Sequence, residues 1–492
     1  MTTVIRSTLA TGLPELASRG SSPELAVPGY DRKALQPGVV HFGVGGFHRA
    51  HQAIYLDDLA ARGETAWGIV GVGMHSREMQ QVLSSQDNLF TVVQRGYESE
   101  HARIVGVVID YLFAPRQADA VLAALVDPRT RLVTLTVTGA GYPVDPSTGL
   151  FLPHADEIAR DLLHPRTPRS VFGFIVEALR LRRAAGTAPF TVLSSDNVPE
   201  NGRTTATAVC GYARASDPAL ADWIEQHVTF PSSMVDRITP GTSPWDRDDI
   251  AERMGIDDGW PVITEPFSQW IIEDRFCNER PPLDEVGAQF VDDVRPYELM
   301  KTRLLNGSHC ALGYLGLLLG HTSSDEAMGD AFIREYLTAL MGQVVPLLPP
   351  VVGTDLQRYR DELIVRFSNP GIADRLDRLA RRGSTKLASY VVPSIVEARR
   401  LGVGSGLLTG TIAAWIELLT RTGDAGGPLH DPMRAQLAPL AAVGDVQGIL
   451  SVIPGFGAIA DDDEVRRDIE RSLRVLRQDG VRSLMRTAVD AA

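Results

Sequence analysis

Short apolar segments alternate with helix-like segments between residues 38 and 195, and this alternation constrains the fold more than any other feature. Leu132–Val137 illustrates the apolar type: it is rich in β-branched residues and lacks polar alternation, which is typical of a strand buried on both faces. Similar segments occupy residues 38–46, 66–72, 90–95, 104–113 and 190–195, and helical spacing occupies 47–62, 78–83, 118–125 and 169–185. This order predicts an α/β fold, a Rossmann-like doubly wound parallel sheet.

The pattern changes near residue 295, where strand signals fade and amphipathic helical segments follow one another to residue 487. A chain of 492 residues is also too long for a single hydrophobic core. We therefore predict a Rossmann-like α/β domain over residues 1–290 and a mostly α-helical domain over residues 291–492.

Composition narrows the classes of partner. With 48 basic and 61 acidic residues the net charge is −13, which argues against nucleic acid or an anionic membrane surface as the main partner.

Cys210, Cys277 and Cys310 show no metal-ligand spacing and predict buried thiols in a reducing compartment. Apolar runs are too short to span a bilayer, and residues 1–25 lack the apolar region of a signal peptide. We expect a cytoplasmic protein that binds a small molecule and no metal.

A glycine-rich turn follows the first predicted strand and precedes the first helix. Its candidate cofactor-binding residues are Gly43, Gly45, Gly46, Phe47, His48 and Arg49. Glycines at this point let the backbone approach a pyrophosphate, which then lies at the N-terminus of the next helix. The match to the dinucleotide fingerprint is imperfect because His48 occupies the third glycine position. A simple tight turn is the alternative.

The end of the second predicted strand bears on the choice of cofactor. An acidic residue here would bind the adenosine ribose of NAD, but Glu78 is the first acid after the strand. His75, Ser76 and Arg77 stand there instead, and these residues suit the 2′-phosphate of NADP or form a solvated loop. NAD and NADP therefore both remain open.

Residues 298–309, Glu-Leu-Met-Lys-Thr-Arg-Leu-Leu-Asn-Gly-Ser-His, form the most informative polar pattern. On an α-helix, at about 100° per residue, Lys301 at 0° shares a broad face with Glu298 near 60° and His309 near 80°. Asn306 lies near the edge of this face, at about 140°. A polar stripe on an otherwise apolar helix needs partners, because unpaired buried polar groups are costly. A salt-bridged helix face with Lys301 paired to Glu298 is the alternative to a catalytic site.

Two more polar clusters follow predicted strands. Asn197 and Asn201 lie beyond the strand at 190–195, where ligands bind in open α/β sheets, while Asp196 suits a helix cap. Asp236 precedes Arg237 and is interpreted from spacing alone as half of a structural ion pair.

Together, residues 43–50, 195–202, 233–240 (Ser-Met-Val-Asp-Arg-Ile-Thr-Pro), 265–276 and 298–309 resemble the mannitol dehydrogenase family of zinc-independent, long-chain polyol dehydrogenases. These motifs run in family order from about residue 38 to 390, so the resemblance covers most of the chain. It implies NAD or NADP as cofactor, a polyol or ketose as substrate and a monomeric protein. It also implies that residues 1–290 form the nicotinamide dinucleotide-binding domain and residues 291–492 the substrate and catalytic domain. Its active site is expected in a cleft between two domains.

The resemblance also implies roles for individual residues. Lys301 matches the general base, which requires a lowered lysine pKa, and Asn197 and Asn306 match the pair that holds the reacting oxygen. His309 and Asp236 match residues that hold substrate hydroxyls. Glu298 matches an acid that relays the proton, and Arg378 matches the substrate-binding arginine, while nearby Lys386 is a further substrate-binding candidate. Gly139 departs from the family, which often has an acid there.

The first expectation is the interconversion of D-mannitol and D-fructose, with D-arabinitol or D-sorbitol as further substrates. A fructuronate or tagaturonate reductase is the alternative within the family, because Arg378, Arg381 and Lys386 suit a substrate carboxylate. A nucleotide-binding protein without turnover is a second alternative, although such a protein needs no base. The absence of a cysteine ligand set argues against a zinc alcohol dehydrogenase.

Overall fold

The computed structural model describes residues 7–9, 25–145, 148–421 and 429–492. The chain divides into two compact units, unit 1 (Met1–Val294) and unit 2 (Arg295–Ala492). In the described part of the chain, no helix is both long enough and apolar enough to cross a membrane.

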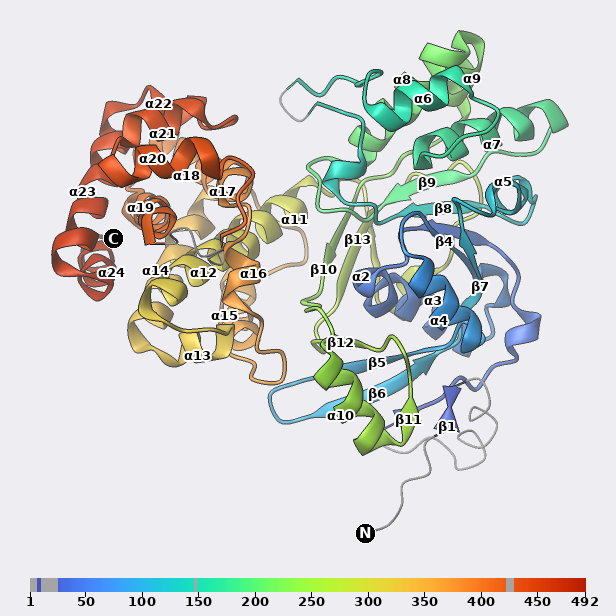
Figure 1. The fold of residues 1–492 in the computed structure, drawn as a ribbon, viewed down its shortest axis with the longest axis horizontal. Helices are drawn as coiled ribbons and strands as arrows, with labels where there is room; N and C mark the ends of the chain where they lie inside the picture. The colour runs from blue at the N-terminus through green and yellow to red at the C-terminus, as the bar shows by residue number, and fades with distance from the viewer. Residues whose placement is uncertain (1–6, 10–24, 146–147, 422–428) are drawn as a thin grey trace. The chain divides into compact units, whose positions relative to one another are not determined.

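Unit 1 is built on a five-stranded parallel sheet (Figure 1). Its strands are β3 (Val39–Phe42), β4 (Ile69–Gly73), β7 (Val108–Phe113), β8 (Leu132–Leu135) and β9 (Thr191–Ser194). The spatial order is β7-β4-β3-β8-β9, and every neighbouring pair is parallel. This is the doubly wound order with its reversal between β3 and β8, where dinucleotides bind in such folds. The predicted Rossmann-like fold is confirmed.

Both faces of this sheet are covered, which explains why its strands are apolar without alternation. On β3, Val40 and Phe42 face one core while Val39 faces the other. The first core is closed by α5 (Ala118–Val126), α7 (Val171–Ala185), α8 (Asn201–Ser216) and α9 (Pro218–His227). The second contains residues of α3 (Gln52–Ala61), α4 (Arg77–Ser85) and further strands. Shorter helical elements are α2 (Gly46–Ala50), α6 (Asp156–Leu163), η1 (Arg32–Ala34), η2 (Thr65–Trp67), η3 (Gly139–Gly141) and η4 (Leu283–Val286).

Three smaller sheets complete unit 1. One has the order β12-β5-β6-β2, with β12 (Val262–Thr264), β5 (Phe90–Arg95), β6 (Glu100–Val105) and β2 (Leu25–Ala26). A second has the order β10-β13-β14, with β10 (Ser233–Asp236), β13 (Gln269–Glu273) and β14 (Gln289–Val291). The third pairs β1 (Ser7–Thr8) with β11 (Ile256–Asp257). The segment at 104–113 thus serves two sheets, because β6 pairs antiparallel with β5 while β7 joins the parallel sheet.

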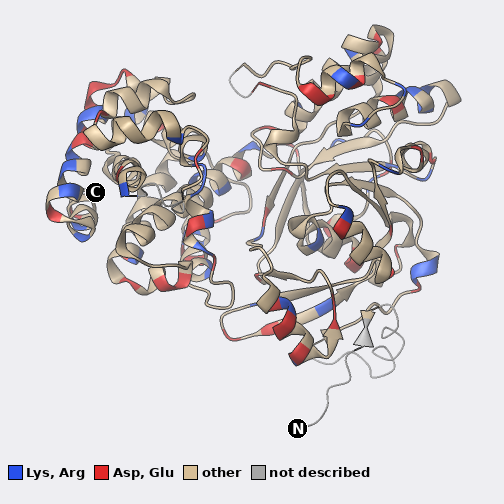
Figure 2. Cartoon of the chain, in the orientation of Figure 1, with Lys and Arg blue, Asp and Glu red and all other residues tan. Residues whose placement is uncertain are grey.

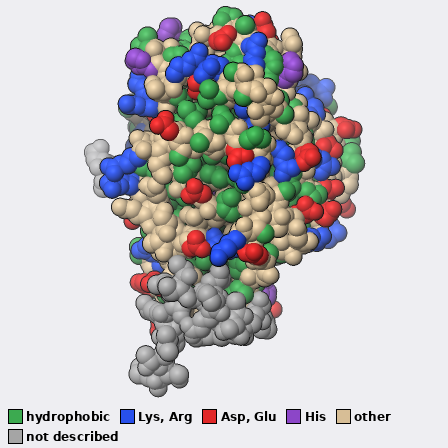
Figure 3. Space-filling view, turned by 90° about the vertical axis from the view of Figure 1, so that its right-hand side faces the viewer, with side chains coloured by type: hydrophobic (Ala, Val, Ile, Leu, Met, Phe, Trp, Pro, Cys, Tyr) green, Lys and Arg blue, Asp and Glu red, His purple; other side chains and the backbone are tan. Residues whose placement is uncertain are grey.

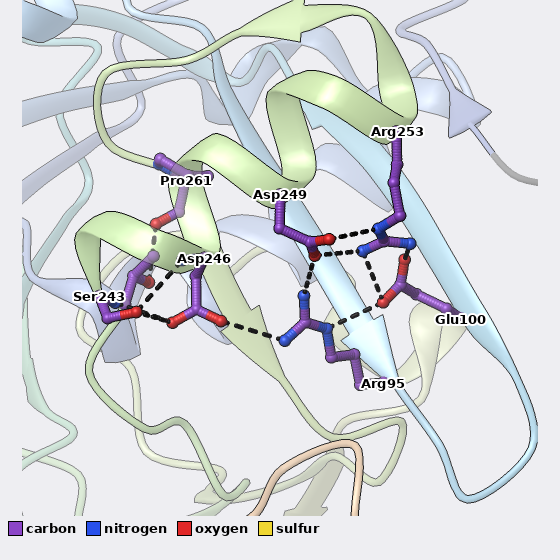
Figure 4. A network of polar contacts seen from close by, with 8 residues as sticks. Arg95, Glu100, Ser243, Asp246, Asp249, Arg253 and Pro261 are labelled. Carbon is purple, nitrogen blue, oxygen red and sulfur yellow. Dashed lines mark hydrogen bonds and ion pairs between the residues drawn. The ribbon is translucent and has the colours of Figure 1, made fainter.

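A network of ion pairs ties α10 (Pro244–Met254) to the β5–β6 hairpin (Figure 4). Arg95 contacts Glu100 at 2.8 Å, Asp249 at 3.1 Å and Asp246 at 3.2 Å. Arg253 closes the network on Glu100 and Asp249. The Arg95 side chain is only 14% exposed, so solvent screens these contacts less than ordinary surface pairs.

Unit 2 is helical in all of its regular described elements. Two apolar helices, α12 (Gly307–Leu319) and α19 (Gly406–Arg421), pack together, with α16 (Leu376–Ala380) against α12 and α23 (Asp463–Asp479) against α19. Helices that are apolar on almost every side belong in a core. The other elements are α11 (Arg295–Met300), η5 (Lys301–Asn306), α13 (Ser324–Gly329), α14 (Ala331–Val344), η6 (Val345–Leu347), α15 (Leu356–Phe367), α17 (Gly383–Tyr390), α18 (Val392–Leu401), α20 (Arg434–Val443), α21 (Val446–Val452), α22 (Gly457–Ala460) and α24 (Val481–Asp490).

Candidate functional site

A cavity of about 700 Å³ lies in unit 1 at the carboxyl ends of β3, β4 and β8. Its walls come from the turn after β3, the residues after β4, the loop after β8, and the first turns of α6 and α7. The lining residues include Gly43, Gly45, His75, Ser76, Val137 and Thr138. This edge of a doubly wound sheet, at the reversal of strand order, is where a dinucleotide binds.

The turn after β3 needs glycine at position 43. Gly43 has φ +97°, and a Cβ atom there would lie 2.2 Å from the carbonyl oxygen of Thr136. Buried His41, on β3, contacts two threonines of the neighbouring β8 segment. Its Nδ1 lies 2.7 Å from Thr134 Oγ1, and its Nε2 lies 3.0 Å from Thr136 Oγ1. Burial lowers the pKa of His41 to about 3, so the ring is neutral at physiological pH. Gly43 therefore lets the backbone of the turn pass close to Thr136, and both residues line the cavity.

The predicted cofactor residues divide into two groups. Gly43, Gly45, His75 and Ser76 line the cavity, whereas Gly46, Phe47, His48, Arg49 and Arg77 are not among its described lining residues. The buried ring of His48 stacks on His41 at 3.5 Å between centroids, and Phe47 stacks on His51. Buried Arg49 lies over the Phe90 ring and donates to the Trp260 carbonyl. The Arg49 side chain therefore supports the neighbouring sheet and does not line the cavity.

The segment after β9 carries Asn197, whose side chain is exposed. Asp196 does not cap a helix as its position suggested, because α8 begins at Asn201 with Glu200 as its N-cap. The Asp196 carboxylate instead accepts backbone N–H groups from the loop after β8. The buried amide of Asn201 donates to the Asp196 and Ser233 carbonyls and accepts from Ser233 N. Asn201 therefore holds the segment beside β10 in place.

Asp236 is the last residue of β10 and is 2% exposed. Its neighbour Arg237 donates to two backbone carbonyls, Ala50 at 2.6 Å and Glu265 at 3.0 Å. Burial lowers the pKa of Arg237 to about 10. These carbonyl contacts give the arginine a structural role that does not depend on pairing with Asp236.

The Lys301–Asn306 segment forms a π-helical turn between α11 and α12, a difference from the predicted α-helix. An α-helix would place Lys301 and Asn306 about 140° apart. In a π turn each N–H bonds to the carbonyl five residues back, so residues five apart lie on the same side of the helix, as residues four apart do in an α-helix. The Thr302 hydroxyl donates to the Glu298 carbonyl at 2.7 Å at the start of this turn. Lys301 is 4% exposed, and Glu298 and Asn306 are half-buried.

Two further observations mark this stretch. The Nδ2 of Asn306 is buried and has no hydrogen-bond partner among the described residues. His309, one turn later on α12, packs against Phe367 with ring centroids 4.6 Å apart. Because an unsatisfied buried amide is costly, Asn306 is suited to bind a group that the protein alone does not provide.

The predicted substrate cations are already engaged within unit 2. Arg378 forms a two-pronged contact with buried Asp374, through Nε at 2.7 Å and through Nη2. Arg381 pairs with Asp377 at 2.9 Å. Lys386 Nζ donates to the Leu379 carbonyl at 2.8 Å, and burial lowers its pKa. The spacing of four residues between each arginine and its acid was the sequence signal for these pairs.

The described residues contain no group of three or more His, Cys, Asp and Glu side chains arranged to hold a metal ion. Sequence reasoning missed Tyr142, a cavity-lining residue whose hydroxyl donates to Asp196 at 2.9 Å. It also missed Asp156 and Glu157, which line the cavity from the first turn of α6. No sequence motif marks the loop that places these acidic residues beside the cavity.

Both units match models of known protein domains. Residues 37–285 match the mannitol dehydrogenase Rossmann domain, and residues 293–477 match the mannitol dehydrogenase C-terminal domain. The mannitol 2-dehydrogenase of Pyricularia oryzae is 39% identical and aligns over 97% of this chain and 98% of its own length. Mannitol dehydrogenase 2 of Saccharomyces cerevisiae is 40% identical, with 98% of each chain covered.

Two solved structures extend this likeness to the fold. The mannitol 2-dehydrogenase of Pseudomonas fluorescens, in a ternary complex with NAD and D-mannitol, matches with a TM-score of 0.90 and 41% identity, covering 99% of this chain and 100% of that one. A substrate-free D-sorbitol dehydrogenase matches with a TM-score of 0.85 and 35% identity, covering 95% and 99%. The resemblance seen in the motifs is thus confirmed over nearly the whole length. The chain belongs to the mannitol dehydrogenase family.

Proposed function

We propose that this protein is an NAD-dependent, zinc-independent polyol dehydrogenase that interconverts D-mannitol and D-fructose. The observation that carries the proposal is its 41% identity to an enzyme solved with NAD and D-mannitol. D-Arabinitol and D-sorbitol are further candidate substrates, and the 35% identical D-sorbitol dehydrogenase supports this wider range. Family membership and the cavity at the edge of the parallel sheet support a bound dinucleotide.

Lys301 is the proposed general base, which removes the proton from the alcohol being oxidised. Lys301 is 4% exposed, and its assignment as the base rests on family membership. Asn197 and Asn306 donate amide hydrogen bonds to the reacting oxygen and stabilise the developing alkoxide. NAD, held in the cavity lined by Gly43 and Gly45, would supply the hydride acceptor.

The remaining proposed roles concern substrate binding and proton release. Asp236 and His309 hold hydroxyl groups of the substrate, and Glu298 passes the proton of Lys301 to water. Arg378 donates to a further hydroxyl. These assignments rest on family membership and on the burial of Asp236 and Lys301.

A neutral polyol suits these residues better than a uronate. A substrate carboxylate needs an uncommitted cation, but Arg378 is balanced by Asp374 and Arg381 by Asp377. Lys386 points its amine at backbone carbonyls, and its pKa is lowered by burial. These contacts argue against the fructuronate or tagaturonate alternative.

NAD is the proposed cofactor in preference to NADP. No Lys or Arg stands among the described lining residues of the cavity, and Asp156 and Glu157 add negative charge there. Arg77, the predicted partner of a 2′-phosphate, begins α4 and is not among those lining residues. A 2′-phosphate would therefore lack a Lys or Arg partner among these lining residues.

We also propose a monomeric cytoplasmic enzyme whose partners are small molecules. The net charge of −13 and the intermixing of basic and acidic residues along the chain support the part of this proposal that concerns partners (Figure 2). On the face that Figure 3 shows, Lys and Arg side chains are scattered among acidic and apolar ones instead of forming one basic field. Such a surface gives nucleic acid or anionic lipid little electrostatic attraction.

The test is the absorbance of reduced cofactor, with NAD and NADP each offered with D-mannitol, D-arabinitol, D-sorbitol and D-mannonate. We expect NAD reduction with neutral polyols, fastest with D-mannitol. Turnover of mannonate alone would move the protein to the sugar-acid branch. No turnover on any pair, with NADH still bound, would support the non-catalytic alternative.

A further inference from the structure

Two loops leave the parallel sheet next to each other in unit 1. Strands β8 and β9 pair in register, with Leu135 opposite Ser194, so the residues that follow them lie side by side. Loop A, residues 136–142, lines the cofactor cavity. Loop B, residues 195–200, carries Asn197. A Cβ atom placed on Gly139 of loop A would lie 3.5 Å from the Val198 side chain of loop B, so the two loops touch.

The carboxylate of Asp196 joins these loops. Its Oδ1 accepts the N–H of Thr138 at 2.7 Å, and its Oδ2 accepts the N–H of Val137 at 3.0 Å. Oδ2 also accepts the Tyr142 hydroxyl at 2.9 Å, and that hydroxyl lies 2.7 Å from Ser194 Oγ. Among the described residues no Lys or Arg forms an ion pair with Asp196, which is 8% exposed. Burial raises the pKa of Asp196, and the three hydrogen bonds from loop A oppose this effect by stabilising the carboxylate.

Loop A adopts a conformation that its sequence disfavours. Thr138 has φ +67° and ψ 158°, a region that is populated almost only by glycine. A β-branched residue persists there only when its surroundings impose the conformation. The N–H of Thr138 itself bonds to Asp196, so this carboxylate is one of the groups that impose it.

We infer that Asp196 is a positioning residue: it holds Thr138 in its strained conformation and thereby fixes loop A against the loop that carries Asn197. The inference rests on the proposed function, in which loop A borders the cofactor and Asn197 binds the reacting oxygen. Without both carboxylate oxygens Thr138 relaxes, the cavity wall moves, and Asn197 loses its fixed place relative to the cofactor.

A double-mutant cycle tests this role with Asp196→Asn and Thr138→Gly. The asparagine turns an NH₂ group toward one of the two N–H donors, so one hydrogen bond is lost and one donor is left unpaired. We expect Asp196→Asn to lower kcat/KM for D-mannitol by about 10- to 100-fold and to weaken NADH binding several-fold. Glycine needs no support at φ +67°, so in the Thr138→Gly background the same change should lower kcat/KM by no more than about threefold.

Asp258→Asn is the matched control. Asp258 is another buried aspartate that accepts two backbone N–H groups, from Thr91 and Trp260, but it is not among the described cavity-lining residues. We expect this variant to lose thermal stability while its kcat/KM and NADH affinity stay at wild-type values. A comparable catalytic loss in this control would mean that general destabilisation explains the Asp196 effect.

The inference is wrong if Asp196→Asn leaves kcat/KM and NADH affinity unchanged, or if it costs as much in the Thr138→Gly background as in the wild-type background. Titration with NADH, followed by protein fluorescence, tests this inference independently of the proposed function. If the wild-type protein oxidises no polyol, a loss of NADH affinity in Asp196→Asn that Thr138→Gly suppresses still supports the positioning role, and its absence overturns that role.

Discussion

Lys301 and Asn306 lie at the two ends of one π-helical turn, five residues apart along the chain. The turn brings onto one side of the helix two residues that an α-helix would separate by about 140°. Both residues belong to the proposed catalytic set, and π turns inside α-helices occur frequently at functional sites. The local backbone therefore explains how a Lys-x4-Asn spacing can serve one reacting oxygen.

Deleting Arg303 tests the π turn. A π turn is an α-helix with an extra residue, so the deletion should leave an α-helix in which Lys301 and Asn306 are four apart and still share a face. We expect a folded protein with measurable mannitol oxidation. Deleting Glu335, an exposed residue in the regular helix α14, is the control and should disrupt packing, because it rotates all later residues by about 100°. Equal unfolding of both variants in circular dichroism would contradict the π-turn explanation.

Gly43→Ala should damage the cofactor site. The added Cβ would lie 2.2 Å from the Thr136 carbonyl oxygen, at a residue with φ +97°. The substitution would introduce strain of about 1–3 kcal/mol, and the turn would move to release it. We therefore expect NADH to bind about 10- to 100-fold more weakly, as measured by fluorescence titration. Gly63→Ala is the control, since Gly63 has φ +98° but no atom within 4 Å of the added Cβ. It should lose some stability and keep its NADH affinity; equal weakening in both would point to a general effect of strain.

The Arg95 network should make stability depend on pH in the acid range. The pKa of Asp249 is lowered by a hydrogen bond from Arg253 and by the charges of Arg253 and Arg95, against the opposing effect of burial. The pKa of Glu100 is also lowered: burial opposes this shift, but hydrogen bonds from Arg253 and Arg95 outweigh it. Groups with a lowered pKa in the folded state stabilise it above their unfolded pKa values of about 4, and this stability is lost as pH falls through the folded pKa.

Arg95→Met should therefore lower the free energy of unfolding by about 1–3 kcal/mol at pH 7 and flatten its decline below about pH 5. Urea denaturation at several pH values measures both effects. Arg214→Met is the control, because Arg214 pairs with Asp222 and Glu225 at exposed positions and should change stability little. A wild-type acid profile in Arg95→Met would contradict the proposed contribution of the network.

Much of the fold follows from local sequence patterns. The β-branched, non-alternating strands required helices on both faces, and the glycines after β3 marked the edge where the cavity lies. The separate β5–β6 hairpin was not predictable in the same way. Its antiparallel pairing and the placement of β12 beside β5 depend on contacts between segments far apart in sequence.

The site shows the same limit. Lys301, Asn306 and His309 were recognisable as one polar stripe, but the π turn that relates them has no simple composition signal. The role of Asp196 depends on N–H groups 58 and 59 residues earlier in the chain, so its position after a strand suggested only a cap. Local spacing identifies candidate groups, whereas the contacts that orient them come from tertiary structure.

The rate of NAD reduction by D-mannitol in the wild-type protein and in Lys301→Ala, with NADH affinity measured on both, is the most direct test of the proposed enzyme. We predict clear wild-type turnover that increases with pH as the base loses its proton, and a loss of at least about 100-fold in kcat for Lys301→Ala. NADH affinity should be the same in both. Full activity in Lys301→Ala, or a wild-type protein that binds NADH but oxidises no polyol, would contradict the proposal.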